Sequence, residues 1–242
     1  MFKSATSPSA GMFAKSHILL SVLATLFLTS SCLGQAAPAQ SPIVCDFKDG
    51  LAVEDATCQA KLKGLFERKG DTLILNLDGG TSKAYIGNSA ACDGENVDAS
   101  KCLVFRMLRY FPQSQFYLVE KGLYECGDYL FVSRRTGRET VMSAMPVLSP
   151  NGRYLLSIDD SDACERKYDI AVWSMRTDPP ELEFNYQAKQ YENWELTTWK
   201  DDTHIRLKAW INGKTSYDQE AELVRGAEGW TLKLGKKTDR PR

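Results

Sequence analysis

The fold of this chain is most clearly encoded in Val147-Leu148-Ser149-Pro150-Asn151-Gly152-Arg153-Tyr154-Leu155-Leu156-Ser157. Proline fixes φ where a strand ends, and an Asn-Gly pair then adopts the conformations that a tight hairpin requires. Apolar residues flank the turn on both sides, so a strand is expected on each side. After a loop that contains Cys164, the run from Tyr168 to Ser174 predicts another strand. Residues 147–174 are therefore expected to form one antiparallel unit.

The same order of features occurs once earlier in the chain and, in a more diverged form, once later. In the earlier unit, Tyr110-Phe111-Pro112 leads into Phe116–Val119, a loop with Cys126 and Asp128–Ser133, and Pro112 lies 38 positions before Pro150. A period near 40 with several strands per unit is typical of propeller blades. The later unit runs from Trp194–Trp199 through Asp201-Asp202 and Ile205–Ile211 to Glu220–Val224.

The turn Ser149-Pro150-Asn151-Gly152-Arg153-Tyr154-Leu155 resembles the Ser-Pro-Asp-Gly turn of WD-like β-propeller repeats. Those repeats include the type found in the periplasmic propeller of the Tol system. The resemblance covers one unit of about 40 residues. Asn151 stands where the family has Asp, and the family's Thr-Gly ending is present only as Thr136-Gly137. The resemblance implies a propeller-like repeat of antiparallel sheets.

Alternation of apolar and polar residues with period two extends over much of the rest of the chain, which predicts strands with two distinct faces. No strand–helix alternation is present, so a parallel α/β sheet is not expected. Residues 57–68 fit either a short helix or a hairpin. The fold class expected is all-β and propeller-like, with a partial propeller or a twisted β-sandwich as alternatives. The alternating runs are Leu73–Leu77, Tyr129–Ser133, Ile205–Ile211 and Trp230–Leu234.

Residues 12–40 have the layout of a secretory signal peptide. A short basic segment with Lys15 precedes the apolar run Ile18–Leu28, and a small, polar tail follows. The run is too short for a bilayer-spanning helix, which needs about 20 apolar residues. The chain is expected to consist of a signal peptide (1–36), a linker (37–44) and a single β domain (45–242). The mature protein is then exported to the periplasm or the outer envelope.

Two processing routes remain open. The segments Gly34-Gln35-Ala36 and Ala37-Pro38-Ala39 place small residues as a signal peptidase requires, which gives a soluble product. Alternatively, Ser30-Ser31-Cys32 resembles the lipobox of bacterial lipoproteins, although Leu28 is displaced from its usual position. The protein is expected to contact a membrane only if Cys32 is lipidated.

Six cysteines follow the signal segment, and an even number in an exported chain predicts three disulfides. The pairs Cys45–Cys58 and Cys92–Cys102 are expected because they are nearest neighbours in sequence. The pair Cys126–Cys164 is expected from the repeat, because both cysteines lie in the loop between equivalent strands of successive units. Such loops lie side by side in a propeller, within the ~6 Å that a bridge needs.

The charge balance excludes one class of partner. Removing residues 1–36 removes Lys3 and Lys15 and no acid, so the net charge changes from −1 to −3. Nucleic-acid binding proteins carry a basic stripe, so nucleic acid is not an expected partner. The single histidine after the signal segment, His204, lies beside Asp201 and Asp202, and no nucleophile elbow is present. A solvated turn is the simpler interpretation of His204.

The acidic loop Asp159, Asp160 and Asp162 is the candidate metal site, because dense carboxylates can hold calcium. The EF-hand spacing is missing, and Arg166 and Lys167 can neutralise the loop. A solvated acidic loop is the alternative.

Binding candidates are Arg134 and Arg135, which form a basic hairpin tip with Arg138, and Trp210. Trp210 shares a strand face with Arg206 and Lys208, opposite the apolar one, although core packing is the alternative for it.

These features favour a non-enzymatic β-scaffold that binds a protein or cell-envelope partner outside the cytoplasm. A toxin-immunity or inhibitor-type periplasmic protein is an alternative within the binding class. A calcium-dependent hydrolase acting on a glycan is the enzymatic alternative, and a purely structural lipoprotein is a third.

Overall fold

The computed structural model describes residues 41–45, 47–48, 51–52, 54, 56–93, 97–159, 164, 167–189, 192–211 and 216–240. All described residues belong to one compact unit, Ala36–Arg242. The expected signal segment with Cys32, and the calcium candidates Asp160 and Asp162, lie outside the described residues.

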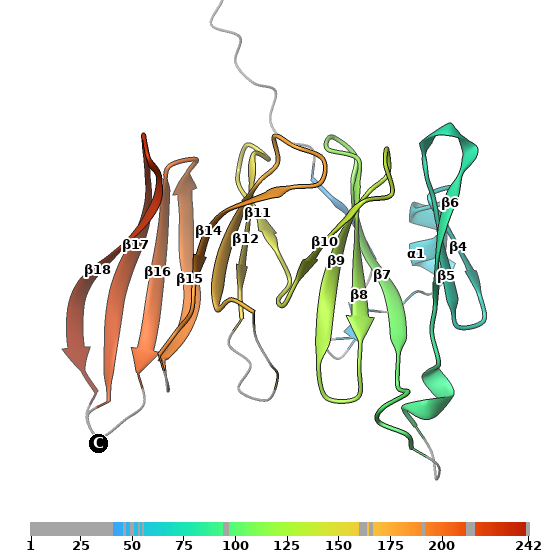
Figure 1. Ribbon diagram of the computed structural model, residues 1–242, viewed down its shortest axis with the longest axis horizontal. Coiled ribbons are helices and arrows are strands. Elements are labelled where there is room, and N and C mark those ends of the chain that lie inside the picture. The colour runs from blue at the N-terminus through green and yellow to red at the C-terminus, as the bar shows by residue number, and fades with distance from the viewer. Residues whose placement is uncertain are drawn as a thin grey trace, which may run out of the picture. The chain divides into compact units, whose positions relative to one another are not determined.

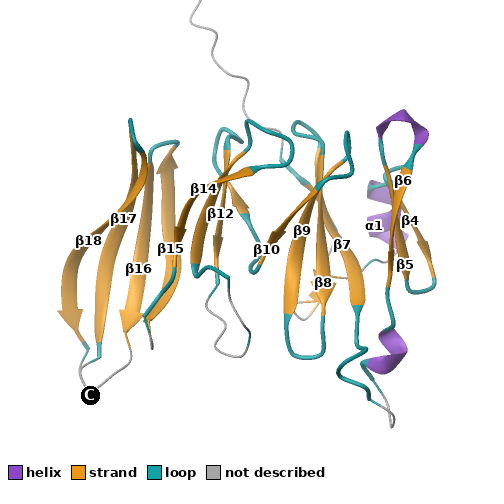
Figure 2. Ribbon diagram, in the orientation of Figure 1, coloured by secondary structure: helices purple, strands orange, loops and turns teal. Residues whose placement is uncertain are grey.

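The described chain is all-β and antiparallel, as the periodicity predicts, and no sheet closes on itself (Figures 1 and 2). The first sheet comprises β4 (Phe66–Lys69), β5 (Thr72–Asn76) and β6 (Ser82–Ile86). The second comprises β1 (Ile43–Val44), β7 (Val104–Phe111), β8 (Phe116–Gly122), β9 (Gly127–Ser133) and β10 (Glu139–Met142). The third comprises β11 (Val147–Leu148), β12 (Tyr154–Ile158), β13 (Ile170–Ser174) and β14 (Glu181–Tyr186). The fourth comprises β15 (Glu192–Asp201), β16 (His204–Ile211), β17 (Tyr217–Gly226) and β18 (Gly229–Asp239).

The remaining elements are short. They are the hairpin β2 (Phe47–Lys48) and β3 (Leu51–Ala52), the helix α1 (Ala56–Lys61), and the 3₁₀ turns η1 (Asp78–Gly80) and η2 (Ser89–Ala91). The segment 57–68, which sequence left open between helix and hairpin, contains the end of α1 and the start of β4.

Each predicted repeat unit lies within one four-strand antiparallel meander. The meanders are β7–β10, β11–β14 and β15–β18, and in each the strands pair in chain order. Pro112 and Pro150 occupy the turn between the first and second strands of successive meanders. Gly152 has φ of +74°, which only glycine adopts readily, so the Asn-Gly turn has its expected physical basis.

Consecutive sheets share hydrophobic cores. A first core lies between the first and second sheets, a second core between the second and third, and a third core between the third and fourth. In β8, Tyr117 and Val119 enter the first core, whereas Phe116 and Leu118 enter the second. The second and third sheets are therefore buried on both faces, and the first and fourth sheets contribute one face each to these cores.

The strand turns at one end of the sheets are tied to their neighbours by carboxylates; we call this the turn end. Asp78 pairs with Arg134 Nε at 3.2 Å and joins the first and second sheets. Asp178 accepts a hydrogen bond from Ser133 Oγ at 2.6 Å and joins the third sheet to the second. Asp202 accepts one from Asn151 Nδ2 and joins the fourth sheet to the third.

The three expected disulfides are confirmed. Cα–Cα distances are 4.7 Å for Cys45–Cys58, 4.6 Å for Cys92–Cys102 and 5.7 Å for Cys126–Cys164. The last bridge joins the β8–β9 loop to the β12–β13 loop, so it links equivalent loops of successive meanders. We call this opposite end of the sheets the disulfide end. Three disulfides indicate an oxidising, exported environment.

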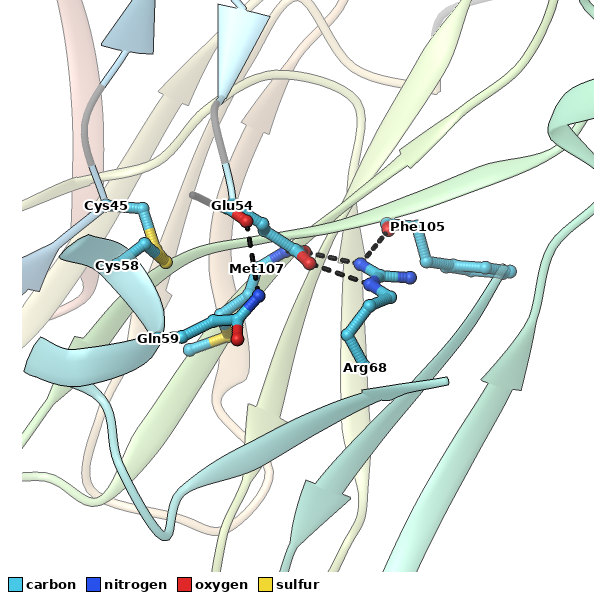
Figure 3. Close-up of a disulfide and its surroundings, with 7 residues drawn as sticks. All are labelled: Cys45, Glu54, Cys58, Gln59, Arg68, Phe105 and Met107. Atoms are coloured by element: carbon cyan, nitrogen blue, oxygen red, sulfur yellow. Dashed lines mark hydrogen bonds and ion pairs between the residues drawn. A yellow bond between two sulfur atoms is a disulfide. The ribbon is translucent and has the colours of Figure 1, made fainter. Parts of the chain in front are cut away.

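An ion pair beside the Cys45–Cys58 bridge fastens the N-terminal segment to the second sheet (Figure 3). The Glu54 carboxylate accepts hydrogen bonds from Arg68 Nε at 2.7 Å and from the backbone N–H of Met107. Arg68 Nη2 also donates to the carbonyl of Phe105 at 2.6 Å. The pair is largely removed from water, with side chains 11% and 21% exposed for Glu54 and Arg68.

Glu54→Gln is expected to lower the free energy of unfolding by about 2 kcal/mol, because it leaves a largely buried guanidinium without its counter-charge. Urea denaturation measures the change. Glu67→Gln is the matched control: Glu67 is exposed and pairs with exposed Lys69 at 3.2 Å, so its loss is expected to stay within about 0.5 kcal/mol. Equal losses in the two variants would contradict the role assigned to Glu54.

Candidate functional site

A cavity of about 360 Å³ opens at the turn end between the second and third sheets. Ligand pockets typically occupy about 300–1,000 Å³, so this cavity has the size of a small binding site. Every lining residue belongs to the described part of the chain. They are Phe111, Gln113, Ser114, Phe116, Arg135, Leu148, Asn151, Gly152, Met175 and Arg176.

The apolar side of the cavity continues the second core. Phe111 and Phe116 are 3% and 2% exposed, and Leu148 and Met175 pack partly buried against the same cluster. The rings of Phe111 and Phe116 lie 5.3 and 4.6 Å from that of Phe131. Tight packing behind these side chains fixes the wall of the cavity in place.

Two arginines supply the charge of the cavity. Arg135 lies in the β9–β10 turn, and Arg176 follows β13. Arg135 Nε is 3.5 Å from Asp178 Oδ2, which makes a loose ion pair. The exposed guanidinium of Arg176 has no ion pair or hydrogen bond within the described residues. No acidic residue is among those that line the cavity.

Backbone hydrogen bonds hold the turns around the cavity. Gln115 N–H donates to the carbonyl of Phe111 at 2.7 Å, and Arg134 N–H donates to that of Gln115 at 2.9 Å. The Ser149 hydroxyl oxygen accepts from the N–H groups of Arg153 and Tyr154, both at 3.0 Å. A rim held in this way loses little conformational freedom when a ligand binds.

The three arginines of the predicted basic tip have different roles in the structure. Arg134 is half-buried, and its hydrogen bond to the Tyr110 hydroxyl raises the pKa of its guanidinium. Arg138 donates to the carbonyl of Asp178 at 3.2 Å. Arg134 and Arg138 thus tie neighbouring turns together, whereas Arg135 lines the cavity.

Trp210 lies far along the chain from this cavity, on the face of the fourth sheet that points away from the third core. It is half-buried between its cross-strand partners Asn193 and Asp218. Lys208 on the same face pairs with Asp218 at 2.9 Å. This face carries interleaved charges of both signs, as a solvated sheet face does.

Asp159 is the one calcium candidate within the described residues, and it is buried. Its backbone N–H donates to the carbonyl of Asp169 at 2.8 Å. No group of three or more His, Cys, Asp or Glu with the arrangement of a metal site occurs among the described residues. The calcium prediction otherwise falls on Asp160 and Asp162, outside them.

His204 belongs to a local turn. Its Nδ1 lies 3.1 Å from Asp201 Oδ1 and 2.8 Å from Thr203 Oγ1. Hydrogen bonds from the Thr203 side chain and backbone, and one from His204, lower the pKa of Asp201. Asp201 therefore caps the β15–β16 turn as a carboxylate, in agreement with the interpretation of His204 as a turn residue.

Sequence reasoning missed Arg176, although the repeat contains the signal for it. The chain leaves β9 as Ser133-Arg134-Arg135 and leaves β13 as Ser174-Met175-Arg176. Aligning the two units at these serines places Arg135 and Arg176 at equivalent positions. Both lie at the turn end, one on each side of the same cavity.

A second cavity, of about 720 Å³, lies at the disulfide end between the same two sheets. Glu120, Glu125, Asp128 and Asp159 line it together with Cys126 and Cys164. It adjoins the loop after Asp159, most of which is outside the described residues. The turn-end cavity is therefore the candidate site.

Within the described residues, no helix has the length and the apolar character that crossing a bilayer would require. Comparisons of this chain with protein-family models, with curated proteins and with solved structures found no match.

Proposed function

We propose that this protein is an exported, non-enzymatic β-scaffold that binds a protein or cell-envelope partner through its turn end. The cavity between Arg135 and Arg176 carries the proposal. It combines an apolar wall, two guanidinium groups of which only Arg135 has a carboxylate nearby, and a rim held by hydrogen bonds. Recognition sites commonly combine an apolar surface with a few fixed polar groups.

The scaffold in this proposal is propeller-like, open rather than closed. Its support is the succession of three meanders that share cores with their neighbours. A repeat that packs on the next in this way presents its turns on a common end, as propeller blades do. Function is nevertheless argued from the cavity, since a fold of this class hosts many functions.

The proposed location is the periplasm or the outer envelope. Support comes from the signal-like segment at 12–40 and from the three disulfides. A lipid on Cys32 would hold the protein at a membrane, with the linker as a tether. A soluble product of cleavage after Ala36 or Ala39 is the alternative within the same proposal.

Site-specific photocrosslinking in the producing cells tests the function. A benzoyl-phenylalanine at Gln113, which is exposed on the cavity rim, is expected to give one dominant light-dependent adduct. The same probe at Glu195, which is exposed on the outer face of the fourth sheet, is the control and is expected to give none.

The outcomes separate the alternatives. A defined adduct from Gln113 alone supports partner binding at the turn end, and mass spectrometry of the adduct distinguishes an envelope component from a toxin or enzyme. An enzyme or toxin partner would favour the inhibitor or immunity role. Identical adducts from both positions, or none from either, would overturn the proposed function.

A further inference from the structure

We propose that the turn-end cavity recognises an apolar carboxylate, meaning a carboxylate group next to a single aromatic or aliphatic group. The inference rests on the proposed function and specifies the chemistry of the group that is bound. It is carried by the charge of the cavity, the donors that its arginines leave open, and the size and nature of its wall.

Charge is the first argument. The cavity has two guanidinium groups and no carboxylate in its lining. The Arg176 guanidinium has no partner within the described residues, so its five donors remain available to a ligand. Arginine's planar fork matches a carboxylate in bidentate geometry, which makes an anion the complementary ligand.

Arg135 retains donors despite its neighbour. The Asp178 carboxylate already accepts hydrogen bonds from Ser133 Oγ at 2.6 Å and from Thr136 Oγ1 at 3.1 Å. The contact of Asp178 with Arg135 is to Nε, at 3.5 Å. The terminal nitrogens of Arg135 donate no hydrogen bond within the described residues, and its side chain is 56% exposed. Arg135 can therefore bind a ligand anion while Asp178 holds its stem.

The apolar wall determines what accompanies the anion. Leu148 and Met175 present partly exposed apolar side chains beside the arginines, and the nearly buried Phe111 and Phe116 close the wall behind them. A fully hydrated anion such as phosphate would leave this surface unused, whereas an aromatic or aliphatic group would remove it from water. The volume of about 360 Å³ is near the lower limit of ligand pockets, which suits one such group and its carboxylate.

This chemistry has two natural sources. One is a free aromatic or aliphatic acid, and the other is the C-terminus of a partner protein whose last residue is apolar. Both place a carboxylate within one or two bonds of an apolar group. The ligands in the experiment are chosen to separate them.

Calorimetric titration of the exported protein, purified with its disulfides intact, provides the test. The ligands are N-acetyl-phenylalanine, its primary amide, inorganic phosphate, and a ten-residue peptide that ends in phenylalanine with a free carboxylate. Acid and amide carry the same apolar group, and the amide lacks the negative charge and one of the two acceptor oxygens. We expect binding of the acid and of the peptide, with the amide weaker by roughly tenfold to hundredfold.

Variants assign the binding to the cavity. Arg176→Ala is expected to weaken binding of the acid by roughly tenfold to hundredfold, because a charge-assisted contact is lost. Its side chain makes no hydrogen bond or ion pair within the described residues, so the variant is expected to fold. Arg135→Ala is the second cavity variant. Arg206→Ala is the control, since it removes the same charge from the exposed outer face of the fourth sheet and is expected to leave binding unchanged.

The proposal is overturned if acid and amide bind equally, if phosphate binds as well as the acid, or if Arg176→Ala and Arg206→Ala behave alike. A peptide that binds at least tenfold more tightly than the free acid identifies a protein terminus as the source; the reverse order identifies a small acid. A specific crosslink at Gln113 without carboxylate binding leaves the proposed function standing and removes only this inference. Carboxylate binding without a crosslink supports this inference and contradicts the proposed binding of a protein or envelope partner.

Discussion

Replacing Cys126 and Cys164 together with alanine is expected to lower the free energy of unfolding by about 4 kcal/mol. The bridge closes a segment of 38 residues, so its removal releases much conformational freedom in the unfolded chain. Among the disulfides of the described residues, it is the one that joins the second sheet to the third. A loss of this size is a large fraction of the 5–15 kcal/mol that holds a typical domain folded.

The Cys92–Cys102 bridge is the matched control, because it closes a segment of only 10 residues. Its double alanine variant is expected to lose about 3 kcal/mol by the same chain-entropy relation. Urea denaturation of both variants beside the unaltered protein gives the two values. A smaller loss for Cys126/Cys164 than for Cys92/Cys102 would show that the bridge between the sheets does not act as assigned.

Phe131→Ala is expected to cost about 3–5 kcal/mol, the usual range for deleting a fully buried aromatic ring. Phe131 is 0% exposed and lies at the centre of the second core. Its ring stacks on Phe116 at 4.6 Å and contacts Phe111 at 5.3 Å. The substitution removes the support behind both cavity phenylalanines, so ligand binding is expected to weaken together with stability.

Phe131→Leu tests whether the effect of Phe131→Ala comes from the lost volume of the side chain or from any change at this position. Leucine keeps much of the apolar bulk, and a change of about 1 kcal/mol is expected. Thermal and urea unfolding of the two variants give the comparison. If Phe131→Ala were no more destabilising than Phe131→Leu, the second core would be able to close around the missing ring, and the cavity wall could not be called rigid.

The repeat and its turns predicted part of each meander from sequence, whereas β10, β14 and β18 lie outside the predicted units. The spacing from Pro112 to Pro150 identified two equivalent hairpins, and the position of Cys126 and Cys164 in equivalent loops predicted their bridge. Local turn chemistry and pairing between neighbouring strands carry this information. The weak third unit also forms its own sheet, β15–β18.

The packing of the middle sheets could not be obtained from periodicity. The alternation over Tyr129–Ser133 suggested two faces of different character. In the structure Leu130 and Val132 enter the first core while Phe131 enters the second. A strand buried on both faces has no polar side, so the distinction that period two relies on is absent there. In the fourth sheet, where one face is solvated, the alternation over Ile205–Ile211 was a reliable guide.

The candidate site was predicted only in part. Arg135 was identified as one of a basic group, yet sequence could not tell it from Arg134, which pairs with Asp78. Whether an arginine of this turn forms an ion pair or lines the cavity depends on which turn of a neighbouring sheet faces it, and the sequence does not show this. Asn151 was recognised for its turn, whereas its hydrogen bond to Asp202 depends on how the third and fourth sheets pack.

Because each shared core joins only two neighbouring sheets, this protein has a built-in order of opening. Detaching β15–β18 gives up the third core and the polar links Asn151–Asp202 and Arg225–Glu183, and no disulfide within the described residues holds that sheet. The second and third sheets are clamped to each other by Cys126–Cys164 and protected on both faces. We therefore expect backbone amide hydrogens to exchange with solvent first in the fourth sheet and last in β8 and β13, and a protease to cleave the fourth sheet before the second and third.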